Sequence, residues 1–166
     1  NEHTDVLVLS HQDSDHTGGA LSVFQQQHQT QVWSSITDTH WLAHRLPLKR
    51  CESGQAWEWD GVQMDFIHPL ATDYDKTLTP NARSCVLRIQ AQGQTVLLTA
   101  DIEAMQEHAL VQRMGDALKA DVLLVPRRRD PIGGAVLAQR RDDDAVLQRE
   151  IAQLDGSEEF RGHANT

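Results

Sequence analysis

The chain has 166 residues, a length that suits one domain with a hydrophobic core. Hydrophobic residues make up 39% of it, and a formal charge of −9 excludes the overall basic surface that recruits nucleic acid or anionic membrane. A phosphate substrate stays open, because metal ions held by acidic ligands present local positive charge. No apolar run approaches the ~20 residues of a membrane span. Because the first residue is Asn1 and an apolar run follows almost at once, we expect no signal peptide in this sequence and expect the chain to be cut from something longer.

Hydrophobic periodicity and turn residues predict the elements of the first half of the chain. The apolar run from Asp5 to Ser10 is typical of a buried strand, and Asp60-Gly61 is typical of a two-residue hairpin turn. In chain order we predict a strand at 5–10, a helix at 18–28, a strand at 31–36, a helical or irregular stretch at 40–47 and a hairpin at 57–67.

The second half begins with a loop at 69–80, followed by a hairpin with arms at 84–89 and 95–99 and a turn near Gly93. An amphipathic helix follows at 102–114, then a short apolar strand at 121–126. The predicted inner face of that helix consists of Ile102, Met105, Ala109, Leu110 and Met114.

The composition changes after Pro126, where apolar content thins and charged blocks appear. We predict a domain over residues 1–126 and a divergent, flexible or loosely packed tail over 127–166, with one weak helix at 145–154. The chain has neither an internal repeat nor a phosphate-binding glycine loop. Its element order therefore predicts an α/β sandwich rather than a nucleotide-binding doubly wound sheet.

Four potential metal ligands follow the first strand within six positions: His11, Asp13, Asp15 and His16. Clustered carboxylates repel one another and desolvate poorly unless a cation neutralises them. The segment therefore predicts an ion site, with a solvated polar turn as the alternative.

Asp101 emerges where the strand at 95–99 ends, just before a predicted helix. A carboxylate at this position can reach a loop at the end of a neighbouring strand. Combined with the first cluster, it predicts a bridging ligand between two metal ions. The alternative is that Asp101 only caps the helix that begins at Ile102.

Three segments resemble the metallo-β-lactamase superfamily, and within it the nuclease-like C-terminal domain of ComEC-type DNA-uptake (competence) proteins. They are residues 9–19, 81–87 and 96–103, and residues 51–62 also look like that subfamily. The resemblance runs from about residue 5 to residue 126. It implies a metallo-β-lactamase-like αββα sandwich that is truncated at its N-terminus and divergent after about residue 126.

The same resemblance implies a two-ion centre. His11 and Asp13 would hold one ion, Asp15 and His16 the other, and Asp101 would bridge them. Such a pair of ions activates a water and stabilises the departing oxygen of a phosphodiester, and Asp15 would also orient the attacking hydroxide.

Asp13 replaces the histidine that is usual in the superfamily, and a carboxylate in place of an imidazole shifts the preference from Zn²⁺ toward Mn²⁺ or Mg²⁺. Asn81 and Ser84 stand where other members place a further histidine ligand. We expect a supporting role for them, with an ordinary serine at a strand start as the alternative for Ser84.

Family membership would imply a metal-dependent hydrolase that cuts DNA and degrades the strand that is not imported. Its partners would be DNA and the membrane-channel portion of the parent protein, with no nucleotide cofactor. The parent would lie in the inner membrane, with this domain on the periplasmic side. The alternatives are a hydrolase of a small ester, thioester or phosphodiester, and a non-catalytic remnant of the domain.

The chain has two cysteines, Cys51 and Cys85. From the residues alone, one disulfide and two free thiols are equally good alternatives. An oxidising location, as the resemblance implies, would fit a disulfide. The family usually continues its last strand as Pro-His-His-Gly-Ser, whereas this chain has arginines at 127–129. That departure predicts a centre short of one ligand, with impaired activity.

The other histidines follow no ligand spacing, and we predict that most lie on the surface: His3, His28, His40, His44, His68 and His108. The four tryptophans could stack on bases, but two of them alternate in a hairpin, which favours core packing. They are Trp33, Trp41, Trp57 and Trp59.

Overall fold

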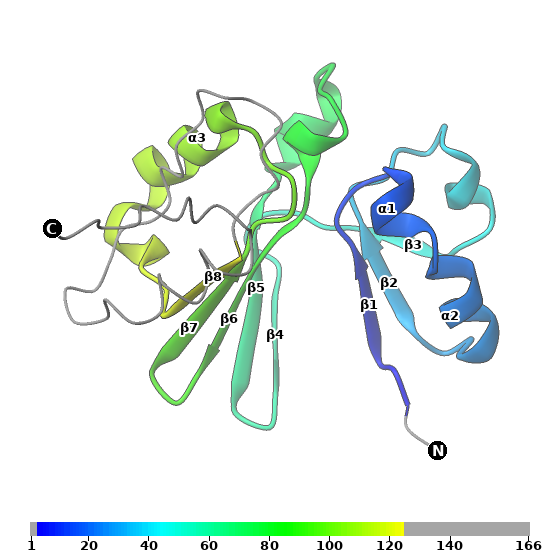
Figure 1. The fold of residues 1–166 in the computed structure, drawn as a ribbon, viewed down its shortest axis with the longest axis horizontal. Coiled ribbons are helices and arrows are strands. Elements are labelled where there is room, and N and C mark those ends of the chain that lie inside the picture. Colours follow the sequence, from blue (N-terminus) through cyan, green and yellow to red (C-terminus); the bar gives the residue numbers. More distant parts are fainter. Residues whose placement is uncertain (1–2, 125–166) are drawn as a thin grey trace, which may run out of the picture.

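The computed structural model describes residues 3–124, which form two β-sheets (Figure 1). The first sheet is parallel and has the order β1 (Val6–Leu9), β2 (Gln31–Ser34), β3 (Leu48–Arg50). The second has the order β4 (Ala56–Trp59), β5 (Val62–His68), β6 (Val86–Ala91), β7 (Gln94–Leu98), β8 (Val122–Leu124). Its pairs are antiparallel except β7 and β8, which run parallel.

Helices cover the outer faces of both sheets (Figure 1). On the first sheet lie α1 (Ser14–Thr17) and α2 (Ala20–Gln26), and on the second lies α3 (Ala104–Met114). Short 3-10 helices complete the structure: η1 (Trp41–His44), η2 (Ala71–Asp75), η3 (Asn81–Arg83) and η4 (Gly115–Leu118). The layers are helix, sheet, sheet and helix, which is the predicted αββα sandwich.

Three apolar clusters hold these layers together. One packs α2 and η1 on the first sheet around Val32, and another packs α3 and η4 on the second sheet around Leu97. The third joins the sheets, because Val8 and Trp33 of the first sheet contact the cluster around Phe66 of the second. The rings of Trp33 and Trp57 stack across this junction, 6.2 Å apart and 3° from parallel.

A disulfide between Cys51 and Cys85 lies within the third cluster. Cys51 directly follows β3, and Cys85 directly precedes β6. The bond therefore links the end of the first sheet covalently to a central strand of the second. Of the two alternatives that the sequence allowed, a disulfide or two free thiols, the structure has the disulfide.

Both predicted hairpins are confirmed, and their turns show why. Asp60 and Gly61 have φ values of 48° and 79°, and Gln92 and Gly93 have φ values of 51° and 79°. Two consecutive positive φ values define the turn whose twist matches that of antiparallel strands. Glycine at the second position adopts this conformation without steric cost.

The helix predicted at 102–114 begins two residues later, with Glu103 as its N-cap. Ile102 is buried but precedes the helix, whereas Leu110 and Met114 pack on the cluster around Leu97, as predicted. Met105 is 79% exposed and Ala109 is exposed, whereas Leu110 is buried. The prediction of an inner face containing Met105 and Ala109 was wrong.

Two further elements differ from the prediction. The strand β3 was not predicted, and the expected loop at 69–80 contains the 3-10 helix η2. The predicted tail at 127–166, its helix at 145–154 and the arginines at 127–129 lie outside the described residues. Within residues 3–124 no helix is both long enough and apolar enough to span a membrane.

Candidate metal centre

The segment that leaves β1 is fixed by three hydrogen bonds. The hydroxyl of Ser34 donates to the carbonyl oxygen of Leu9 (2.8 Å), and the hydroxyl of Ser35 donates to that of Ser10 (2.7 Å). The backbone N–H of Cys85 donates to the same Ser10 carbonyl (2.9 Å). Both sheets therefore hold the residues that precede His11, the first candidate ligand.

The expected ligand loop contains one helical turn, α1, with Asp13 as its N-cap. The backbone N–H groups of His16 and Thr17 donate to the Asp13 carbonyl at 3.0 and 3.1 Å. This turn brings the His16 ring back over His11, with 4.2 Å between the ring centroids. The cluster is thus built on a helical turn rather than on an open loop.

Ser10 orients both imidazoles. Its hydroxyl oxygen lies 3.0 Å from Nδ1 of His11 and 3.1 Å from Nδ1 of His16. A serine oxygen can accept two hydrogen bonds, so both Nδ1 atoms can carry the proton and donate to it. That arrangement leaves both Nε2 lone pairs available to a metal ion, as the supporting contacts of histidine ligands commonly do.

Asp101 reaches the two histidines from the second sheet. Its Oδ2 lies 3.5 Å from Nε2 of His16, and its side chain is 12% exposed. One ligand atom from each of His11, His16 and Asp101 lies within 4.8 Å of the others. Because the N-cap of α3 is Glu103, the alternative role of Asp101 as a cap is wrong.

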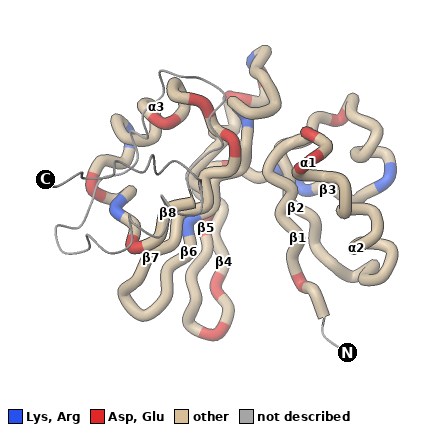
Figure 2. Tube along the Cα trace, viewed as in Figure 1, with Lys and Arg blue, Asp and Glu red and all other residues tan. Residues whose placement is uncertain are grey.

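The remaining two carboxylates flank His11, His16 and Asp101. Asp13 places Oδ2 3.5 Å from Nε2 of His11, and Asp15 places Oδ2 4.0 Å from Nε2 of His16. The structure therefore gathers all five residues that the sequence singled out. In Figure 2 acidic positions on α1 appear in red beside the strand ends.

The interior of this cluster has the donor chemistry of a metal site. His11 is 1% exposed, and its Nε2 atom is buried without a hydrogen-bond partner in the described part of the chain. Burial, and then the neighbouring His16, lower the pKa of His11 against the opposing effect of the three aspartates. A neutral imidazole is the form that ligates metal, so a divalent cation fits the unpaired nitrogen and the carboxylates around it.

Ser84 belongs to the support of the cluster. It is fully buried, and its hydroxyl lies 3.3 Å from Nδ1 of His11. Asn81 accepts a hydrogen bond from the Ser84 backbone N–H through its own carbonyl (2.9 Å). The role of Ser10 was not predicted from the sequence, although its position directly before the candidate ligand His11 was the available signal.

The histidines outside the cluster mostly follow the prediction. His3, His28, His44 and His108 are exposed. His40 is half-buried, and His68 is buried with Nε2 3.0 Å from the carbonyl oxygen of Ala82. Of the tryptophans, Trp33 and Trp57 pack between the sheets, whereas Trp41 and Trp59 are 56% and 45% exposed.

Comparison with known proteins agrees with this arrangement, since the family model of the metallo-beta-lactamase superfamily matches residues 2–163. The chain belongs to the metallo-beta-lactamase superfamily. Competence protein ComA of Neisseria gonorrhoeae is 35% identical over 121 residues, which are 73% of this chain and 16% of that protein. Recombination protein 2 of Haemophilus influenzae is 29% identical over 143 residues, 85% of this chain and 17% of that protein.

Among solved structures, a metallo-beta-lactamase variant from Cronobacter sakazakii aligns with a TM-score of 0.44 at 15% identity, covering 72% of this chain and 56% of that one. The chain spans about a sixth of the length of the two curated relatives, at 16% and 17%. In these two relatives, the region that matches this chain is therefore a small part of a longer protein.

Proposed function

We propose that this superfamily domain is a metal-dependent hydrolase that cleaves phosphodiester bonds of DNA. The meeting of His11, His16 and Asp101 carries the proposal. Nε2 of His11 is buried and has no hydrogen-bond partner among residues 3–124, and the Asp13 carboxylate lies 3.5 Å from it. Relatives named for competence and for recombination support DNA as the substrate.

Two divalent ions would occupy the centre, one held by His11 and Asp13 and one by His16 and Asp15, with Asp101 between them. Three of the five ligands are carboxylates, which favours Mn²⁺ or Mg²⁺, with Zn²⁺ as the alternative. When bound, such ions supply Lewis acidity and lower the pKa of a water.

The residues of the chain supply orientation and proton transfer. Ser10 holds both imidazole rings by Nδ1, so that their Nε2 atoms face the acidic side chains. Asp15 has a side chain that is 47% exposed, which leaves it accessible to a proton from an attacking water. Asp101 has a side chain that is only 12% exposed, and its negative charge would attract divalent ions to this position.

The location we propose is the periplasmic side of the inner membrane, as a module beside the membrane channel of a DNA-uptake protein. The Cys51–Cys85 disulfide supports it, because disulfides persist in oxidising compartments and are rare in the cytosol. The module would degrade the strand that is not imported.

Metal binding and DNA cleavage test the proposal separately. Isothermal titration of the chelator-treated protein with Mn²⁺ and with Zn²⁺ measures binding, and nicking of a plasmid in Mn²⁺ measures hydrolysis. We expect Asp101→Ala to weaken binding and Asp15→Ala to reduce nicking by about a hundredfold or more. The matched control is Asp116→Ala, since Asp116 has an 86% exposed side chain on η4.

The outcomes discriminate between the candidate functions. Unchanged nicking in both Asp15→Ala and Asp101→Ala would overturn the two-ion mechanism. Metal binding without nicking would direct the search to small esters, thioesters or phosphodiesters. A chain that binds no divalent metal would be a non-catalytic remnant of the domain.

A further inference from the structure

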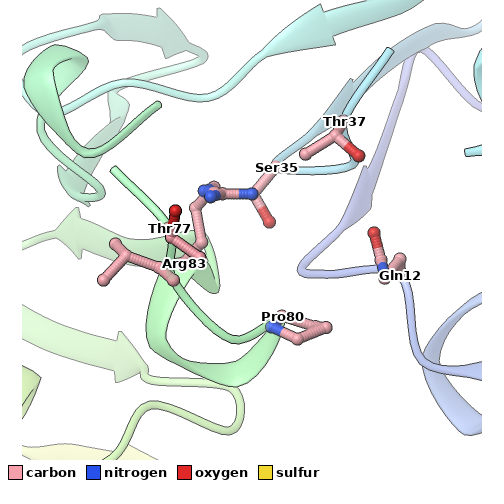
Figure 3. Close-up of a pocket in the computed structure, with 7 residues that line it drawn as sticks. Gln12, Ser35, Thr37, Thr77, Pro80 and Arg83 are labelled. Carbon is pink, nitrogen blue, oxygen red and sulfur yellow. The ribbon is translucent and has the colours of Figure 1, made fainter. Parts of the chain in front are cut away.

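A cavity of about 250 Å³ lies beside the candidate metal centre. One side of it is formed by Gln12 and by residues that follow β2, Ser35 and Thr37. The other side comes from the segment between β5 and β6 and includes Thr77 and Arg83 (Figure 3). The cavity thus lies between the first sheet and the second.

Arg83 places a buried positive charge in the wall of this cavity. The residue is only 8% exposed, and among residues 3–124 no carboxylate forms an ion pair with it. One terminal nitrogen donates to the carbonyl oxygen of Lys76 (3.0 Å), whereas Nε is buried without a partner in that part of the chain. A guanidinium stays charged at any physiological pH, so its burial without an anion is unfavourable.

The Arg83 side chain points toward the space that a ligand would occupy. Figure 3 shows Arg83 pointing into the cavity, with Thr77 on one side of its guanidinium and Ser35 on the other in this view. The Tyr74 ring lies 5.8 Å from the guanidinium carbon and supports it from outside the cavity. The cavity therefore combines one planar cation with several hydroxyl donors.

The cavity and the metal centre share a wall. Gln12 stands between two of the candidate ligands, His11 and Asp13. Arg83 directly precedes Ser84, whose hydroxyl lies 3.3 Å from Nδ1 of His11. A ligand in the cavity would therefore lie next to any group held at the metal centre.

We propose that this cavity binds a phosphate of the DNA backbone that neighbours the phosphodiester being cleaved. The proposal rests on the proposed function and adds the residues that recognise the strand. Arg83 supplies the charge and a planar pair of donors that matches phosphate oxygens, while Thr37, Thr77 and Gln12 supply neutral donors. The cavity volume lies just below the ~300–1,000 Å³ of typical small-molecule sites, which suits one phosphate with its sugar.

Binding of a fluorescent single-stranded oligonucleotide to metal-free protein, followed by anisotropy in the presence of a chelator, tests the proposal without relying on activity. We expect Arg83→Gln to weaken binding about tenfold or more, because a charged hydrogen-bonding group is lost. Thr37→Val, which removes one hydroxyl at nearly constant shape, should weaken it by less. The matched control is Arg50→Gln, because Arg50 also lies over the Tyr74 ring but does not line the cavity. We expect it to change affinity by less than about twofold.

A second readout keeps the test valid if Arg83→Gln does not fold. In the wild-type protein, the ¹⁵N–¹H resonance of Arg83 Nε should shift on titration with the oligonucleotide, and Arg83→Lys identifies it by removing it. Inorganic phosphate, titrated separately, shows whether a free anion suffices. A shift with inorganic phosphate but none with the oligonucleotide would overturn the assignment to the DNA backbone.

Failure of this proposal is distinguishable from failure of the proposed function. If Asp101→Ala abolishes nicking while Arg83→Gln binds the oligonucleotide like wild type, the hydrolase stands and the phosphate site is refuted. If Arg83→Gln loses oligonucleotide binding while the wild-type protein nicks no DNA, the phosphate site stands without the hydrolase.

Discussion

The disulfide should account for a large share of the stability of the domain. Cys51 and Cys85 are 34 residues apart in the sequence, and their bond restricts the unfolded chain. In the chain-entropy treatment a closed loop of that length lowers the unfolded-state entropy by an amount worth about 3.8 kcal/mol at 25 °C. A typical domain has a free energy of unfolding of only ~5–15 kcal/mol, so the loss on reduction is easily measured.

Urea unfolding of the metal-free protein, with and without a phosphine reductant, isolates this contribution because the native contacts of the two sulfur atoms change little. We expect the reduced protein to be less stable by about 3–4 kcal/mol. The double variant Cys51→Ala/Cys85→Ala is the control, and its stability should not respond to the reductant. It should lie somewhat below that of the reduced protein, because both cysteines are buried and their truncation leaves small voids.

A difference below about 1 kcal/mol between the oxidised and reduced proteins would refute the reasoning. It would mean that the unfolded chain already keeps residues 51 and 85 close, or that native packing changes when the bond opens. A reductant effect on the double variant would show that the assay measures something other than this bond.

Three further predictions concern single side chains. Burial lowers the pKa of His68 from 6.5, so the unfolded chain takes up the proton first. The free energy of unfolding should therefore fall below pH 6.5 by up to about 1.4 kcal/mol per pH unit. Urea titrations at several pH values should show a less steep fall for His68→Gln than for the wild type. Arg88 donates from Nε and from a terminal nitrogen to the carboxylate of Asp65 on the paired strand, at 2.9 and 3.0 Å. Arg88→Lys should therefore lower the free energy of unfolding in urea by about 1 kcal/mol, because lysine cannot form both bonds. An unchanged free energy would argue against this paired geometry. Ala100 has a φ of 52°, a conformation that favours glycine. Ala100→Gly should therefore raise the free energy of unfolding by about 1 kcal/mol. A lower urea midpoint of unfolding would contradict this conformation.

Local signals predicted most of the fold. Asp60-Gly61 and the turn near Gly93 predicted hairpins because the preference of glycine for positive φ is a local signal. The strand β3 escaped prediction because it has three residues, two of which are exposed, and so carries no periodicity. The start of α3 was misplaced because Ile102 is buried in the cluster around Leu97 although it precedes the helix.

Part of the candidate site could likewise be predicted from the sequence, and part could not. The ligand-rich segment and Asp101 were visible because several metal-binding residue types stand at the ends of predicted strands. Ser10 and Arg83 were not, because a serine and an arginine are common and their roles depend on contacts that only the folded chain creates. The Ser10 hydroxyl meets His16 only after α1 has turned that ring back.

Three consecutive residues connect the stability of the domain to its site. Arg83 lines the cavity, Ser84 contacts His11, and Cys85 forms the disulfide. The Cys85 backbone N–H also donates to the Ser10 carbonyl, and the hydroxyl of that serine orients both imidazoles. The covalent bond between the sheets therefore ends within one residue of a support for His11. Because an imidazole that binds a metal requires a fixed ring orientation, the disulfide that stabilises the sandwich also limits how far the candidate ligands of the two sheets can move apart.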